Sequence, residues 1–196
     1  MKKTIQTVIA AFAFVCMATP TFAHPGHADA LGFTTGLLHP LLGIDHVLAM
    51  IGVGLYAAIL GGRSFWMLPA AFLTAMMVGG VMGYDGFALP LVEQAIALSV
   101  ITIGAVIALG VKMPVSFGTI LVAAFAIFHG HAHGSEGAEL ASFAQYSLGF
   151  AAATTLLHVT GAALWLCLDK LEKPTTPLLR RTMGAVSVFA GVGLLG

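Results

Sequence analysis

Charged side chains are scarce in this 196-residue chain, at 8% of the residues, and its eight basic side chains balance eight acidic ones. A soluble domain carries about 25% charged residues. Hydrophobic residues make up 59% of the sequence, so we expect an integral membrane protein. The zero net charge gives no indication of nucleic acid as a partner, and membrane lipid is the expected surrounding.

Cysteine is also scarce, with Cys16 and Cys167 as the two in the chain. Residues 1–23 have the pattern of a cleaved secretory signal peptide, in which two lysines precede an apolar run from Thr7 to Met17 and the cleavage pattern Thr21-Phe22-Ala23 follows. Cleavage would leave Cys167 alone, which excludes a disulfide or a thiolate metal cluster within one mature chain. The alternative is an uncleaved first span and seven helices, although this apolar run is shorter than the ~20 residues of a span.

Six apolar segments follow the signal peptide, and the loops between them leave no room for a soluble domain. They cover residues 32–60, 65–83, 87–110, 114–128, 140–168 and 179–195, and the fourth is short unless 129–133 extends it. Because lipid satisfies no backbone polar group, each segment should be a helix. We therefore expect an all-α integral membrane protein, in which residues 24–196 form a single permease domain of six transmembrane helices.

Basic residues follow alternate segments, which predicts the orientation of the chain in the membrane. The connections between segments one and two, three and four, and five and six lie on one side and carry Arg63, Lys112, Lys170, Lys173, Arg180 and Arg181. The connections on the other side carry no basic residue. The positive-inside rule then places the N-terminus and loops 84–86 and 129–139 outside. With six spans, we expect periplasmic N- and C-termini in a multi-pass protein of the bacterial inner (cytoplasmic) membrane.

Three ionisable residues, His39, Asp45 and His46, lie inside the first apolar segment, in the sequence H-P-L-L-G-I-D-H. Each costs roughly 2.5 to 3.5 kcal/mol at membrane depth, so together they indicate an ion path. On a regular helix the two histidines are ~10 Å apart along the axis and cannot share an ion. A break between Pro40 and Gly43 would allow all three side chains to meet. The alternative is that they hydrogen-bond between helices for packing alone.

A second polar cluster is F-H-G-H-A-H-G-S-E, residues 128–136, with His129, His131, His133 and Glu136. Alternate histidines in a glycine-rich strip favour a flexible, exposed segment that collects metal. Histidines tolerated in an exposed loop are the alternative. His129 adjoins an apolar run, and we expect it within the membrane.

Isolated polar or sulfur-containing residues extend the candidate path. Glu93 is expected two turns into the third span, where a carboxylate needs a cation or a proton. His158 lies near the middle of the fifth segment, where a hydrogen bond to a neighbour is the other explanation. Met50 follows His46 by one helical turn, and a mature N-terminus would present the imidazoles of His24 and His27.

Imidazole and carboxylate ligands, with methionine available, suit nickel, cobalt, zinc or copper more than magnesium or calcium. Transport requires binding that is weak enough to release the ion, so a series of partial sites fits better than one closed cage. We therefore expect no permanently bound cofactor, and a transition-metal cation as the substrate.

The two histidine motifs, H-P-x-x-G-x-D-H and F-H-G-x-A-H-G-x-E, resemble those of the HupE/UreJ family of bacterial nickel and cobalt permeases, and the resemblance covers the whole chain. It implies a metal path through His39, Asp45, His46, His129, His133 and Glu136. His131 occupies the family's variable position. The resemblance also implies that the protein supplies metal to a nickel enzyme such as hydrogenase or urease, with the maturation proteins of that enzyme as partners.

The leading hypothesis is uptake of Ni²⁺ or Co²⁺ into the cytoplasm by secondary or facilitated transport, and not an enzymatic reaction. The sequence has no ATP-binding loop that would power the transport. A membrane metal sensor or chaperone is one alternative. A metal-dependent intramembrane enzyme is another, although the zincin pattern H-E-x-x-H is absent.

Overall fold

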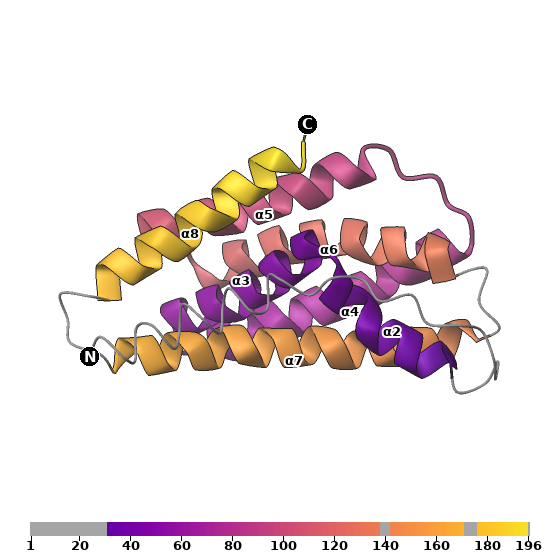
Figure 1. The fold of residues 1–196 in the computed structure, drawn as a ribbon, viewed down its shortest axis with the longest axis horizontal. Coiled ribbons are helices and arrows are strands. Elements are labelled where there is room, and N and C mark those ends of the chain that lie inside the picture. Colours follow the sequence, from indigo (N-terminus) through magenta and orange to yellow (C-terminus); the bar gives the residue numbers. More distant parts are fainter. Residues whose placement is uncertain (1–30, 138–141, 171–175, 196) are drawn as a thin grey trace.

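The computed structural model describes residues 31–137, 142–170 and 176–195, and this part of the chain contains helices and no strand. Figure 1 shows α7 along one side of the molecule and α5 beside α8 along the opposite side. The helices are α2 (Leu31–Leu42), α3 (Ile44–Leu60), α4 (Ser64–Tyr84), α5 (Val92–Leu109), α6 (Val115–Gly137), α7 (Phe143–Asp169) and α8 (Thr176–Gly193). The expected all-α class is thus confirmed.

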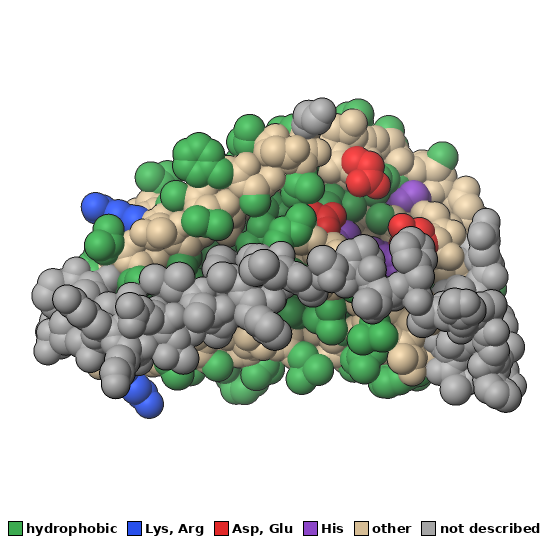
Figure 2. Space-filling view, in the orientation of Figure 1, with side chains coloured by type: hydrophobic (Ala, Val, Ile, Leu, Met, Phe, Trp, Pro, Cys, Tyr) green, Lys and Arg blue, Asp and Glu red, His purple; other side chains and the backbone are tan. Residues whose placement is uncertain are grey.

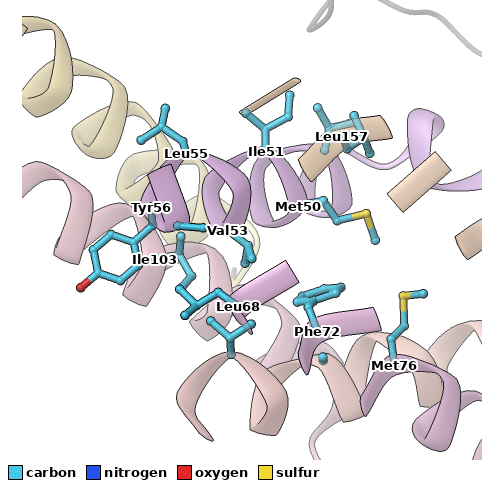
Figure 3. Close-up of a cluster of buried hydrophobic side chains, with 14 of the residues drawn as sticks. Met50, Ile51, Val53, Leu55, Tyr56, Leu68, Phe72, Met76, Ile103 and Leu157 are labelled. Carbon is cyan, nitrogen blue, oxygen red and sulfur yellow. The ribbon is translucent and has the colours of Figure 1, made fainter. Parts of the chain in front are cut away.

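Helix α3 lies at the centre of the molecule. All its residues from His46 to Ala58 are buried, which is possible because its sequence is apolar on every face after His46. Figure 3 shows Met50 and Val53 of α3 facing Phe72 and Leu68 of α4, in a cluster that also includes Tyr56. This apolar cluster forms the core of the bundle.

The outer surface is apolar too, as lipid contact requires. Trp66 is 74% exposed, Leu109 76% and Phe189 78%. Four described helices, α4 to α7, are long and apolar enough to cross a membrane, and a fifth span results if α2 and α3 count as one. Together these features are those of a multi-pass membrane protein. The count of six spans stays a prediction, because α8 carries Arg180 and Arg181 near its start.

Glycines allow α4 and α6 to approach closely. A Cβ atom at Gly79 would overlap the backbone of Ile127, and one at Gly83 would overlap that of His131. Contacts of this kind are typical of helix packing in membranes. Both residue numbers rise along the contact, so α4 and α6 run in the same direction.

Helices α5 and α8 are packed in the same way but run in opposite directions. A Cβ atom at Gly104 would meet the backbone of Gly184, whereas Gly191 lies against Ile101. If each apolar segment crosses the membrane in turn, the second and fourth run in the same direction and the third and sixth run in opposite directions. The directions of α4 and α6, and of α5 and α8, agree with this.

Charged residues are separated along the long axis of the bundle. On the face that Figure 2 shows, Lys and Arg lie at one end, and Asp, Glu and His lie toward the other. The basic end includes the α8 residue Arg180, whose guanidinium donates a hydrogen bond of 2.7 Å to the Ile107 carbonyl at the end of α5. The acidic end contains the candidate metal site.

The predicted signal peptide, its cleavage point, His24 and His27 all lie outside the described residues. These expectations remain predictions, as does the periplasmic position of both termini.

Candidate metal site

The first membrane segment is broken where the sequence predicts. Gly43 has an extended backbone (φ −94°, ψ 118°) between α2 and α3, and the two helices meet at an angle of 84°. Pro40 lies one turn earlier and has no amide hydrogen to donate within α2. The break turns α2 across the end of α7, so that His39 and His46 can approach a common neighbour.

The common neighbour is His133 of α6. We expected residues 128–136 to form a flexible, exposed segment, and this expectation is wrong. Helix α6 continues to Gly137, and His129, His131 and His133 are 0%, 9% and 5% exposed. The glycines between the histidines explain the difference, because Gly130 and Gly134 lie against the backbone of α4 and let this helix pack closely. The three histidines are therefore buried on a regular helix, and Glu136 at its outer end stays exposed.

Five side chains form a continuous row, which we call the histidine–carboxylate cluster. Glu136 Oε2 lies 3.0 Å from His39 Nε2 and 3.2 Å from His133 Nδ1. His133 Nε2 contacts His46 Nε2, and His46 Nδ1 lies 2.7 Å from Asp45 Oδ1. Three elements, α2, α3 and α6, thus contribute to one site.

The two carboxylates determine which imidazole nitrogens are free to bind an ion. A carboxylate can only accept a hydrogen bond, so His46 donates from Nδ1 to Asp45 and His133 donates from Nδ1 to Glu136. Each neutral ring then keeps its lone pair on Nε2, and these two nitrogens face each other. Two facing lone pairs repel unless a cation lies between them. Histidine ligands of metals are typically oriented by carboxylates in this way.

A second set of ligand atoms lies at the outer side of the same cluster. One ligand atom each of His39, His133 and Glu136 falls within 4.8 Å of the others. A pocket of about 230 Å³ adjoins them, and its wall includes all five cluster residues and Glu93. The site is thus open to water on this side. His133 belongs to both sets, and its neutral ring can offer its one lone pair to only one ion at a time.

His129 extends the site inward from the cluster. Its ring lies perpendicular to that of His46, with 5.1 Å between the ring centres, and it is completely buried. Its Nε2 contacts Ser99 Oγ of α5 at 2.9 Å. Phe72, with a ring centre 5.7 Å away, marks the start of the apolar core beyond it.

Glu93 and Met50 differ in their relation to the site. The expectation that Glu93 lies two turns into a span is wrong, because Leu91 adopts a left-handed conformation and α5 begins only at Val92. Glu93 is exposed and lines the pocket. Met50 is fully buried in the apolar core, outside the lining of that pocket.

His131 and His158 lie outside the cluster. His131 donates from Nε2 to the Phe87 carbonyl at 2.5 Å, which ties α6 to the segment before α5. His158 packs edge-on against Phe72, with ring centres 5.1 Å apart, and neither of its ring nitrogens has a hydrogen-bond partner among the described residues.

The sequence motifs do not mark Ser99. It lies in an apolar helix, 30 residues before His129. In the sequence it cannot be distinguished from a serine whose hydroxyl bonds only the backbone of its own helix. Only the packing of α5 against α6 brings it to the site.

Comparison with known proteins identifies the family of the chain. The HupE / UreJ protein family matches residues 12–194. "Protein HupE" from Rhizobium leguminosarum bv. viciae is 44% identical over 192 residues, which are 97% of this chain and 96% of the relative. No solved structure matches the chain. A match over nearly the whole length at this identity means that the chain belongs to the HupE / UreJ family.

Proposed function

We propose that this protein carries Ni²⁺, or Co²⁺, across the bacterial inner membrane into the cytoplasm, where a nickel enzyme such as hydrogenase or urease receives the metal. The observation that supports this most strongly is the pair of facing Nε2 atoms of His46 and His133, each oriented by a carboxylate. Such a pair needs a cation, and imidazole nitrogen suits these metals.

The two sets of ligand atoms suggest the order of binding. The ion first meets His39, His133 and Glu136 beside the open pocket. It then moves to the facing Nε2 atoms of His46 and His133, because His133 belongs to both sets. Successive partial sites of this kind let an ion advance without complete rehydration.

The inner half of the bundle is closed in the described conformation. Beyond His129 the path meets the buried apolar cluster around Met50 and Phe72. An unsolvated divalent ion cannot enter such surroundings without a large electrostatic cost, so release requires the helices around α3 to move. A potential that is negative inside favours inward movement by about 2.3 kcal/mol per charge per 100 mV.

Radiotracer nickel uptake in cells tests the proposal. His46→Ala removes one of the two facing nitrogens, and we expect uptake at low nickel concentration to fall to the level of cells that lack the protein. His131→Gln is the matched variant, because this buried histidine binds the Phe87 carbonyl instead of the cluster. We expect it to retain uptake when the rate is corrected for the amount of protein in the membrane.

Two results would contradict the proposal. Wild-type uptake by the His46→Ala variant would exclude the cluster as the metal path. Tight nickel binding by purified protein, without flux into liposomes, would instead indicate a sensor or chaperone. Competition by unlabelled cobalt in the same assay establishes which metal the protein prefers.

A further inference from the structure

Ser99 of α5 makes two hydrogen bonds in the interior of the bundle. The residue is 2% exposed. Its hydroxyl oxygen lies 2.7 Å from the Ile96 carbonyl of the same helix and 2.9 Å from His129 Nε2 of α6. Both distances are those of well-formed hydrogen bonds.

These two contacts determine which nitrogen of His129 carries the hydrogen. A carbonyl oxygen can only accept, so the single hydroxyl hydrogen of Ser99 points to Ile96. The Ser99 oxygen can then only accept from His129, which must donate from Nε2. The neutral ring of His129 consequently keeps its lone pair on Nδ1.

His129 Nδ1 is completely buried and has no hydrogen-bond partner among the described residues. An unpartnered buried lone pair is costly, and a cation is the partner that would remove the cost. The neighbouring rings support this, since His46 lies at 5.1 Å and His133 is one helical turn further along the same face of α6. The surroundings therefore contain other lone-pair donors.

We propose that Ser99 is a positioning residue that orients His129 and keeps its Nδ1 available as the innermost ligand of the metal path. It would do for His129 what Asp45 does for His46 and Glu136 does for His133. A neutral hydroxyl replaces the carboxylate, so the innermost ligand adds no negative charge that would retain the ion. This inference rests on the proposed transport function.

The tautomer of His129 can be measured without any transport. Purified protein with ¹³C- and ¹⁵N-labelled histidine is studied by NMR without metal, at a pH where imidazole is neutral. The His129 signals are assigned by their loss in His129→Gln. We expect the wild type to hold the hydrogen on Nε2, and Ser99→Ala to show a mixture of both tautomers.

Nickel uptake by four variants gives the second readout. Loss of a residue that orients a metal-binding histidine lowers affinity or activity about 10- to 100-fold, and we expect this loss at low nickel concentration in Ser99→Ala. Ser99→Cys keeps the volume but hydrogen-bonds weakly, so it should behave like alanine. Ser99→Thr keeps the hydroxyl and should recover uptake. Ser187→Ala is the control, because among the described residues the Ser187 hydroxyl donates only to the Met183 carbonyl of its own helix.

Specific outcomes would overturn the inference. Wild-type uptake and an unchanged His129 tautomer in Ser99→Ala or Ser99→Cys would do so, and the cysteine variant keeps the test valid if the alanine variant does not fold. Equal losses in Ser99→Ala and Ser187→Ala would indicate a general packing effect and also overturn it. If the wild type carries no nickel, the transport function fails, whereas the tautomer measurement still decides the role of Ser99.

Discussion

At the scale of single residues, the site depends on carboxylates that orient histidines. Glu136 Oε2 is within 3.2 Å of two imidazole nitrogens, and more than half of the Glu136 side chain is exposed, at 57%. It can therefore reach both water and the buried ring of His133. This position suits a residue that exchanges the water of an incoming ion for protein ligands.

Glu136→Gln keeps the shape of this side chain but removes its charge. We expect nickel uptake to fall at least about tenfold, because the substitution removes an anionic ligand and weakens the orientation of His133. Glu93→Gln is the matched control, since Glu93 lines the same pocket but forms no ion pair with a histidine among the described residues. Initial rates of radiotracer uptake measure both variants, and equal losses would contradict a specific role for Glu136.

At the scale of helices, glycine determines how closely the elements that carry the histidines can approach. Gly130 and Gly134 alternate with histidines on α6, and a Cβ atom at either would overlap the backbone of α4. The glycines of the second motif are therefore a packing surface, and the histidines between them are directed toward other helices. This explains why a glycine-rich sequence forms a buried helix rather than a loop.

Gly130→Ala should separate α4 from α6. A Cβ atom at this position meets the Met76 carbonyl, which cannot rotate away as a side chain would. We expect a loss of about 1 to 3 kcal/mol, the usual effect of overpacking. At about 2 to 4 °C per kcal/mol, thermal unfolding of the purified protein in detergent detects this change.

Gly193→Ala is the control for this substitution, because a Cβ atom there meets nothing within 4 Å. The melting temperature of this variant should equal that of the wild type. A stable Gly130→Ala protein would show that α4 and α6 are not in contact as described.

At the scale of the whole molecule, the polar site lies toward one end of an otherwise apolar bundle, and basic residues lie at the opposite end (Figure 2). The positive-inside rule would place the site at the periplasmic side. Metal ions would then compete there with external protons, since histidine binds a metal only when the imidazole is neutral.

Nickel uptake should therefore fall as the external pH is lowered. Free imidazole has a pKa of about 6.5, so below this pH the protonated, cationic form excludes the metal. With several histidines involved, we expect at least about a tenfold fall in rate between pH 7.5 and 5.5 at low nickel concentration. Proteoliposomes with a clamped membrane potential measure this effect. A higher nickel concentration should restore the rate, and a rate independent of pH would contradict imidazole ligands on the outer side.

The sequence was sufficient to predict the membrane class, the family, the break between Pro40 and Gly43 and the residues of the cluster. Each of these follows from local composition or from a short motif. The helical state of 129–137, the burial of its three histidines and the start of α5 at Val92 were not predictable, because they depend on packing against α4 and on the backbone at Leu91.

The sequence by itself determined the chemistry of the site, since the types of side chain and the break at Gly43 are local properties. Only the tertiary structure decided which atoms meet. His39 and His46 approach His133, which lies 87 residues after His46, while His131 turns to Phe87 and Ser99 contacts His129. The physical reason is that contacts between distant helices depend on close packing at glycines, whose partners a single sequence does not reveal.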